Sequence, residues 1–173
     1  GMLYQLKVTD IPVGKLRDKG TPIENISKYD GKTERILMLT SLEQIMGKKL
    51  IFATRMASVK VVPAEEFITN NRAVASTKFQ DDDKLVTVRA AAEGDVVLQT
   101  MNGYFLRFPC GEISEMKKNS KGVRGIKLER DDELEHLYLV DEDGTILYKK
   151  KEVQLNRLKL AKRDGKGTKV RLS

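Results

Sequence analysis

The sequence has little of what most catalytic and metal sites are built from. It contains one cysteine, Cys110, one histidine, His136, and no tryptophan. A lone cysteine excludes an intramolecular disulfide and fits a reducing cytoplasm. A lone histidine with no nucleophile or further ligand beside it is typical of a strand surface. We therefore expect no catalytic residue, no metal site and no cofactor in this chain.

Long hydrophobic runs are also missing. No stretch of about 18 apolar residues occurs, so we expect no membrane span. The start, GMLYQLKV, lacks the layout of a signal peptide, which favours a cytoplasmic location. A glycine before the first methionine is typical of a residue left by an expression tag, so we expect a piece of a longer protein.

Positive charge is concentrated at one end of the chain. Of the 173 residues, 32 are Lys or Arg and 25 are Asp or Glu, and residues 144–173 hold ten of these cations but only two of the acids. Such a segment indicates a polyanionic partner, with nucleic acid the first candidate and an acidic membrane surface the second. Of the two we expect nucleic acid and no membrane. A solvated tail that only aids solubility is the alternative.

One short motif occurs four times. SKGVRGIKL (residues 120–128) aligns with NRAVASTKF (71–79), DKGTPIENI (18–26) and GKGTKVRL (165–172). The basic position recurs at spacings of 53, 49 and 45 residues, at Lys19, Arg72, Lys121 and Lys166. The repeats predict a single domain over residues 1–173, divided approximately into 1–46, 47–93, 94–140 and 141–173.

A second motif lies between these turns. IFATRMASVKVVPAEEF (residues 51–67) aligns without a gap with VLQTMNGYFLRFPCGEI (97–113), and both are rich in strand-forming residues. We expect hairpin turns at Asn102-Gly103 and Asp143-Gly144, and short helical turns at 42–46 and 64–67. About four strands per repeat predict an all-β, propeller-like array of four-stranded blades, of which about three to four are present.

Four segments along the chain are characteristic together: YQLKVTDIP, KGTPIENI, LIFATRMASVKVVPAEEF and SKGVRGIKL. Through them the whole chain resembles the C-terminal domain of the A subunits of DNA gyrase and topoisomerase IV. It implies a β-pinwheel, whose blades exchange strands, and a basic outer rim that wraps double-stranded DNA and presents it for strand passage. It further implies an accessory domain of an ATP-dependent type IIA topoisomerase, whose partners are a catalytic core and an ATPase subunit, at the nucleoid.

The family also has a basic box, Q-R-R-G-G-K-G in its full form. AKRDGKG (residues 161–167) matches five of its seven positions in kind, and MKKNSKG (116–122) matches fewer. The full box precedes the strand that begins this chain in the gyrase pattern. The absence of the full box favours a subunit of the topoisomerase IV type. A gyrase chain that begins after the box would lack it equally, so gyrase and topoisomerase IV both stay open.

Turns that combine glycine with Lys or Arg are the candidate DNA site. Glycine lets a backbone approach a phosphate, and the flanking cations supply charge. The candidate DNA-binding residues are Lys15, Arg17, Lys19, Arg72, Lys117, Lys118, Lys121, Arg124, Lys127, Lys162, Arg163, Lys166 and Lys169, with turn glycines Gly20, Gly122, Gly125, Gly165 and Gly167. No element suited to reading bases accompanies them, so we expect little sequence preference.

Several alternatives stay open. Glycine for turn geometry and charge for solubility would explain the same turns. Residues 149–151, KKK, are a DNA contact or a charged edge strand. The acidic turns FQDDDK and ERDDE are more typical of solvated connections than of metal sites. At most one of Lys60 and Arg107 is expected to face DNA. A propeller-like protein-interaction scaffold and an RNA-binding β array are the alternative functions.

Overall fold

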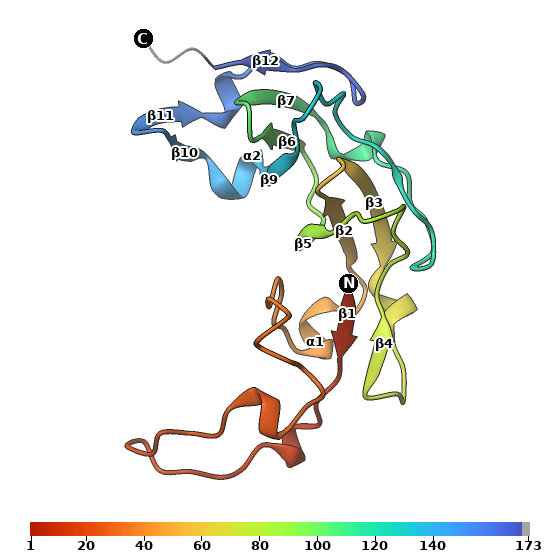
Figure 1. The fold of residues 1–173 in the computed structure, drawn as a ribbon, viewed down its shortest axis with the longest axis vertical. Helices are drawn as coiled ribbons and strands as arrows, with labels where there is room; N and C mark the ends of the chain where they lie inside the picture. The colour runs from red at the N-terminus through yellow and green to blue at the C-terminus, as the bar shows by residue number, and fades with distance from the viewer. Residues whose placement is uncertain (171–173) are drawn as a thin grey trace.

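The computed structural model describes residues 1–170 and has the shape of an open arc (Figure 1). It contains two four-stranded and two two-stranded antiparallel sheets. The predicted all-β architecture of four-stranded blades is confirmed, with two blades complete. Arg171 and Leu172, which end the fourth copy of the turn motif, lie outside the described residues.

Each complete blade has the same strand order. The first consists of β5 (Leu85–Ala90), β2 (Lys49–Thr54), β3 (Ser58–Pro63) and β8 (Val123–Arg124). The second consists of β9 (Leu134–Leu139), β6 (Asp95–Thr100), β7 (Tyr104–Pro109) and β12 (Thr168–Lys169). The first three strands of each blade come from one repeat, whereas the fourth comes from the next repeat.

This exchange of the last strand links neighbouring blades. β8 pairs with β3 through Val59 and Val123, and β12 pairs with β7 through Phe105 and Thr168. β1 (Met2–Tyr4) receives β4 (Ala73–Ala75) from the second repeat in the same way. These three sheets therefore combine residues of two repeats, which is the β-pinwheel arrangement, whereas the β10–β11 sheet lies within the fourth repeat.

The remaining elements are short. They are the β10–β11 hairpin (Thr145–Tyr148 and Lys151–Gln154), α1 (Leu42–Ile45), α2 (Val140–Asp143), and the 3-10 turns η1 (Val8–Asp10), η2 (Ile23–Asn25), η3 (Ala64–Phe67), η4 (Cys110–Glu112) and η5 (Leu155–Arg157). α1 and η3 confirm the predicted helical turns at 42–46 and 64–67. Among the described residues no helix has the length and apolar character needed to cross a membrane.

The fourth repeat corrects one predicted turn. Asn102-Gly103 joins β6 to β7 as predicted, but Asp143-Gly144 does not join two strands. Asp143 ends α2, where its carboxylate accepts a hydrogen bond from the Leu139 N–H at 2.7 Å, and Gly144 follows with a φ of 57°. The hairpin turn of this repeat is formed by Lys149 and Lys150, both with positive φ. The KKK segment thus makes a turn, with Lys151 opening β11.

The main core lies between the two complete blades. It includes Ile51 and Val59 from the first blade and Leu98, Phe108 and Leu137 from the second, all at most 4% exposed. Their burial fixes how one blade sits against the next, because packing of this density tolerates little displacement. The outer edges of the two blades are thereby held in a fixed relation.

Candidate nucleic-acid interface

Two basic turns occupy equivalent places on the two complete blades. We call residues 116–122 the first basic turn and residues 161–167 the second basic turn; β8 and β12 follow them directly. The N–H of Met116 donates to the Val61 carbonyl at 2.8 Å, and that of Ala161 donates to the Arg107 carbonyl at 2.9 Å. The two segments that matched the family's basic box are therefore structural counterparts.

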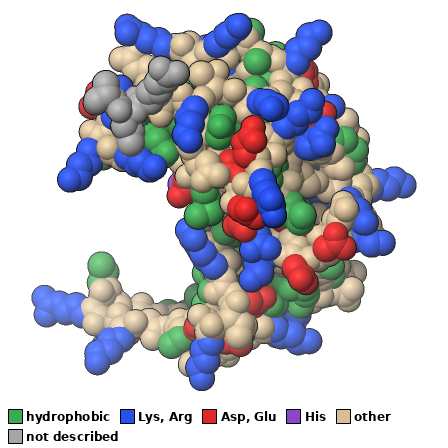
Figure 2. Space-filling model, turned by 45° about the horizontal axis from the view of Figure 1, so that its top comes forward, with side chains coloured by type: hydrophobic (Ala, Val, Ile, Leu, Met, Phe, Trp, Pro, Cys, Tyr) green, Lys and Arg blue, Asp and Glu red, His purple; other side chains and the backbone are tan. Residues whose placement is uncertain are grey.

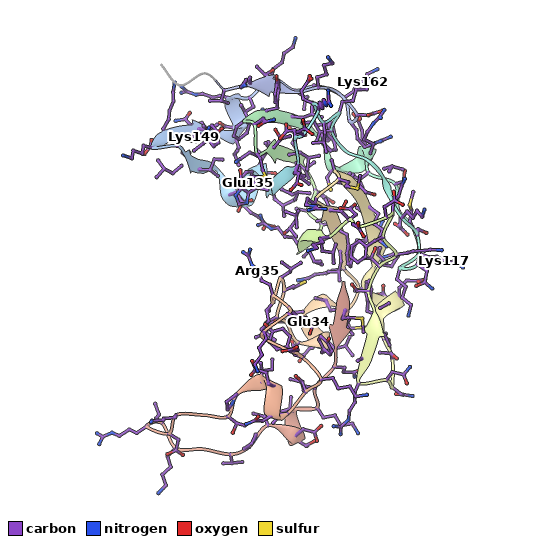
Figure 3. The ribbon with its side chains drawn as sticks, in the orientation of Figure 1. Glu34, Arg35, Lys117, Glu135, Lys149 and Lys162 are labelled. Carbon is purple, nitrogen blue, oxygen red and sulfur yellow. The ribbon has the colours of Figure 1, made fainter. Side chains whose placement is uncertain are left out.

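The cations of the two turns correspond in pairs. Lys117 matches Lys162, Lys118 matches Arg163, and Lys121 matches Lys166. Figure 3 shows Lys117 and Lys162 projecting from the convex edge of the arc, whereas Arg35, Glu135 and Lys149 lie on its concave side. The same spacing of charge is thus repeated from blade to blade along the convex edge.

Charge is segregated between the two edges of the blades. The turn-bearing segments 114–127 and 158–169 each contain five Lys or Arg and one acid, while residues 129–143, around β9, contain eight acids and one Arg. In Figure 2 many Lys and Arg side chains project from the outline of the molecule, and others lie among the acidic side chains of that face. The segments that bear the turns therefore carry net positive charge, and residues 129–143 carry net negative charge.

The second basic turn is fastened to the chain that follows the first. The guanidinium of Arg124 binds both carboxylate oxygens of Asp164, which raises the pKa of Arg124 and lowers that of Asp164. The Lys127 N–H donates to the Gly165 carbonyl at 2.8 Å, and the Asp164 N–H donates to the Gly125 carbonyl at 2.7 Å. The second basic turn is therefore held against residues 124–127, which follow the first basic turn in the chain.

Some predicted DNA-binding cations already have partners. Arg163 donates to the carbonyls of Glu112 at 3.0 Å and Arg124 at 2.6 Å. Ion pairs join Lys166 to Glu129 at 3.6 Å and Arg72 to Asp10 at 3.3 Å. The ammonium group of Lys169 lies 5.4 Å from the centre of the Tyr104 ring. Within residues 1–170, no ion pair is made by Lys117, Lys118, Lys121, Lys127 or Lys162.

Three predicted cations are not brought to this surface. Lys15, Arg17 and Lys19 lie in an extended arm, residues 11–22, at the end of the arc opposite β12 (Figure 1). Val13 and Leu16 in the same arm are fully exposed. The arm therefore adds no charge to the two basic turns.

Packing accounts for most of the turn glycines. A Cβ at Gly122 would lie 2.8 Å from the Val59 carbonyl oxygen, and one at Gly167 would lie 2.7 Å from that of Phe105. At Gly125 a Cβ would lie 2.6 Å from the Leu98 side chain, whereas at Gly20 nothing lies within 4 Å. These glycines let the exchanged strand pack on its neighbour. Close approach to phosphate stays a prediction.

Two kinds of residue in and behind the turns were not recognised in the sequence. Asp83 and Asp132 in the acidic turns are buried, and their carboxylates accept the N–H groups of Met56 and Asn102 at the hairpin turns. Lys60, also buried, donates to carbonyls of the first basic turn. Arg107 binds Asp95, so neither Lys60 nor Arg107 is directed to the outer surface.

Known proteins resemble this chain along most of its length. The family model described as "DNA gyrase C-terminal domain, beta-propeller" matches residues 48–92 and 94–141. The DNA gyrase A protein of Lawsonia intracellularis is 33% identical over 130 residues, and that of Staphylococcus aureus is 28% identical over 181 residues. These matches cover 74% and 98% of this chain but only 16% and 20% of the relatives.

Solved structures share the fold. The C-terminal domain of DNA topoisomerase IV superimposes with a TM-score of 0.81 at 24% identity, over 93% of this chain and 53% of that one. The C-terminal domain of DNA gyrase A gives a TM-score of 0.70 at 18% identity, over 88% of this chain and 53% of that one. The chain thus spans about half of these solved domains.

Proposed function

The chain belongs to the DNA gyrase C-terminal domain family, and from that premise we propose that its convex edge binds and bends duplex DNA. The resemblance inferred from the sequence is thereby confirmed, and the domain is an accessory part of a type IIA topoisomerase. The DNA path follows the first and second basic turns from one blade to the next. Contacts are to phosphates, so binding is tolerant of sequence.

The observation that carries this proposal is the repeated cation pattern on one edge. Equivalent positions such as Lys117 and Lys162 present charge at a fixed interval, because the blades that bear them share a packed core. Bending a 20–30 bp site by 40–90° costs roughly 1–6 kcal/mol. Several phosphate contacts along a preformed curved edge offset that cost without any base contact.

Within the whole enzyme, the domain would hold a bent DNA segment near the catalytic core for strand passage. The ATPase subunit would supply the energy, and the complex would act in the cytoplasm at the nucleoid. The chain itself contributes DNA binding rather than catalysis.

The test is the salt dependence of DNA binding by this chain. Affinity for a duplex should fall with salt with a log–log slope of about −0.9 per phosphate neutralised. The double variant K117A/K162A removes one convex cation from each turn, and should flatten the slope by up to about 1.8. The control R35A/K149A removes the same charge from the concave side and should leave the slope unchanged.

Equal loss in both double variants would mean that net charge, not the convex edge, attracts DNA. Strong preference between unrelated duplexes of equal length would contradict phosphate-based binding. Absence of binding at low salt would favour the protein-interaction scaffold as the function.

A further inference from the structure

Lys60 is a buried lysine in the middle of β3. Its side chain is among the largest fully buried ones, and the residue is 2% exposed. It is the one buried Lys or Arg among residues 1–170. An ammonium group is removed from water only at considerable cost, so the contacts that receive it need an explanation.

Those contacts are carbonyls of the first basic turn. The Lys60 ammonium donates to the Lys118 carbonyl at 2.5 Å and to the Ser120 carbonyl at 2.8 Å, and lies 5.3 Å from the centre of the Phe52 ring. No carboxylate of the described residues lies within ion-pair distance of it; the nearby Glu115 pairs with Lys49 at 2.6 Å. Burial lowers the pKa of Lys60 to about 8.

The contacts determine which way the turn faces. Carbonyls that point inward to Lys60 leave the side chains of Lys117 and Lys121 outside, where both are exposed. The Ser58 hydroxyl reinforces this by donating to the Lys121 carbonyl at 2.5 Å. In the second complete blade Leu106 occupies the place of Lys60, three residues before the proline that ends the strand, and the second basic turn depends on the Arg124–Asp164 pair instead.

We propose that Lys60 is a positioning residue that holds the first basic turn in the shape in which its lysines meet DNA. This inference rests on the proposed function, since the turn is taken to be a DNA contact. Lys60 itself does not touch DNA. Its ammonium group gives the Lys118 and Ser120 carbonyls hydrogen-bond donors inside the protein, so that the lysine side chains of the turn face solvent.

The test compares K60M with K84M. Methionine keeps the length of the side chain but removes both donated hydrogen bonds, while K84M removes one exposed charge from the residue immediately before β5 in the same blade. In the DNA-free protein, the one amide of segment 117–122 with a backbone hydrogen bond, Ser120 N–H to the Lys117 carbonyl at 3.0 Å, should exchange about tenfold faster in K60M, as expected for the loss of hydrogen bonds to a charged group. DNA affinity should fall by a similar factor, and K84M should change neither.

A pH series adds a readout that simple packing would not change. Between pH 7 and 9 the wild-type ammonium loses its charge and donates weaker hydrogen bonds, so the protection of the Ser120 amide should fall. In K60M that protection should not follow the same titration. The charged side chains of the turn, Lys117, Lys118 and Lys121, and the Glu115–Lys49 pair that precedes it are identical in both proteins.

Each outcome decides the matter. Unchanged exchange at Ser120 in K60M overturns the proposal, and so does faster exchange throughout β6 and β7, because Lys60 would then serve folding as a whole. If the wild type binds no DNA, the proposed function fails; faster exchange confined to the turn would still establish that Lys60 shapes it. If exchange rises in the turn while DNA affinity stays constant, the shape of the turn is irrelevant to DNA and the proposal is wrong.

Discussion

Residues 1–46 and residues 47–139 contain copies of the same sequence repeat, but they contribute different numbers of strands to the sheets. The first region contributes only β1 to a two-stranded sheet, while the second forms nearly all of the two complete blades. Leu39 and Leu137 each lie two residues before the N-cap of a short helix, at Ser41 and Leu139. Leu39 is 79% exposed and Leu137 is 4% exposed.

The neighbouring strand explains this difference. Leu137 is paired with Leu98 because β9 lies beside β6, and its side chain enters the core between the blades. No strand of the described residues lies beside residues 35–40. The apolar character of a repeat position therefore leads to burial only where a partner strand is present to complete the sheet.

The largest expected effect is on stability at this pair of leucines. Leu137→Ala should lower the free energy of unfolding by about 2–5 kcal/mol, because it opens a cavity in the core. Leu39→Ala should change it by no more than about 0.5 kcal/mol, as at other exposed positions. Urea unfolding of both variants measures the contrast. Equal losses would show that residues 35–40 are covered in solution.

Two glycines in equivalent turns offer the next contrast. Gly20 and Gly122 have φ values of 72° and 92°, but only Gly122 has neighbours in the way of a Cβ. Gly20→Ala should cost about 1–2 kcal/mol of backbone strain. Gly122→Ala should cost about 1–3 kcal/mol more, because the added methyl forces β8 away from β3. Thermal unfolding followed by circular dichroism measures both, and equal shifts would deny the tight packing of the exchanged strand.

Residues 1–46 and residues 47–139 should also differ in how much their lysines and arginines contribute to DNA binding. The triple variant K117A/K118A/K121A should flatten the salt slope by up to about 2.7, since three phosphate contacts are removed. K15A/R17A/K19A removes the same charge from the arm and should have the smaller effect, because nothing holds the arm beside the basic turns. Fluorescence anisotropy with a labelled duplex at three salt concentrations gives both slopes. A larger effect of the arm variant would relocate the DNA path to the first repeat.

The smallest expected effect concerns two tyrosines. The pKa of Tyr4 is raised to about 12, first of all by its hydrogen bond to Glu34, and the pKa of Tyr138 is raised to about 12, first of all by burial. In Glu34→Gln the pKa of Tyr4 should fall toward its ordinary value of about 10, while that of Tyr138 should stay. Phenolate absorbance in an alkaline titration records this as one of the five tyrosines ionising earlier. An unchanged titration would deny the Tyr4–Glu34 contact.

The sequence predicted the blades because their strands are local. The hairpin of β6 and β7 closes at Asn102-Gly103, and the gap-free alignment of residues 51–67 with 97–113 carries over to β2 and β3. The prediction of a hairpin turn at Asp143-Gly144 was wrong. The Asp143 carboxylate instead accepts the Leu139 N–H and binds Arg89 on β5, a contact between distant residues that the local pattern does not reveal. Strands of two residues, such as β8, carry too little pattern to reveal which blade they join.

The sequence predicts which charged residues form the candidate site, but not which residues of the protein bind them. The basic turns were found from Lys117, Lys121 and their counterparts, whereas the engagement of Arg124 by Asp164 depends on how two repeats pack. Lys60 was not recognised as a buried residue because residues 59–62 are all buried, so both faces of β3 are covered and alternation gives no direction. A lysine inside the run VKVVP was the available signal.

Strand exchange also determines how force travels through the arc. The second basic turn belongs to the fourth repeat, yet β12 is hydrogen-bonded to β7 at Tyr104 and Phe105 in the preceding blade. A pull on that turn is therefore resisted as shear along a ladder in the neighbouring sheet, and β8 transmits a pull on the first turn to β3 in the same way. Under tension, the third repeat cannot be extended without breaking the β3–β8 pairing in the first complete blade. The fourth repeat likewise cannot be extended without breaking the β7–β12 pairing in the second.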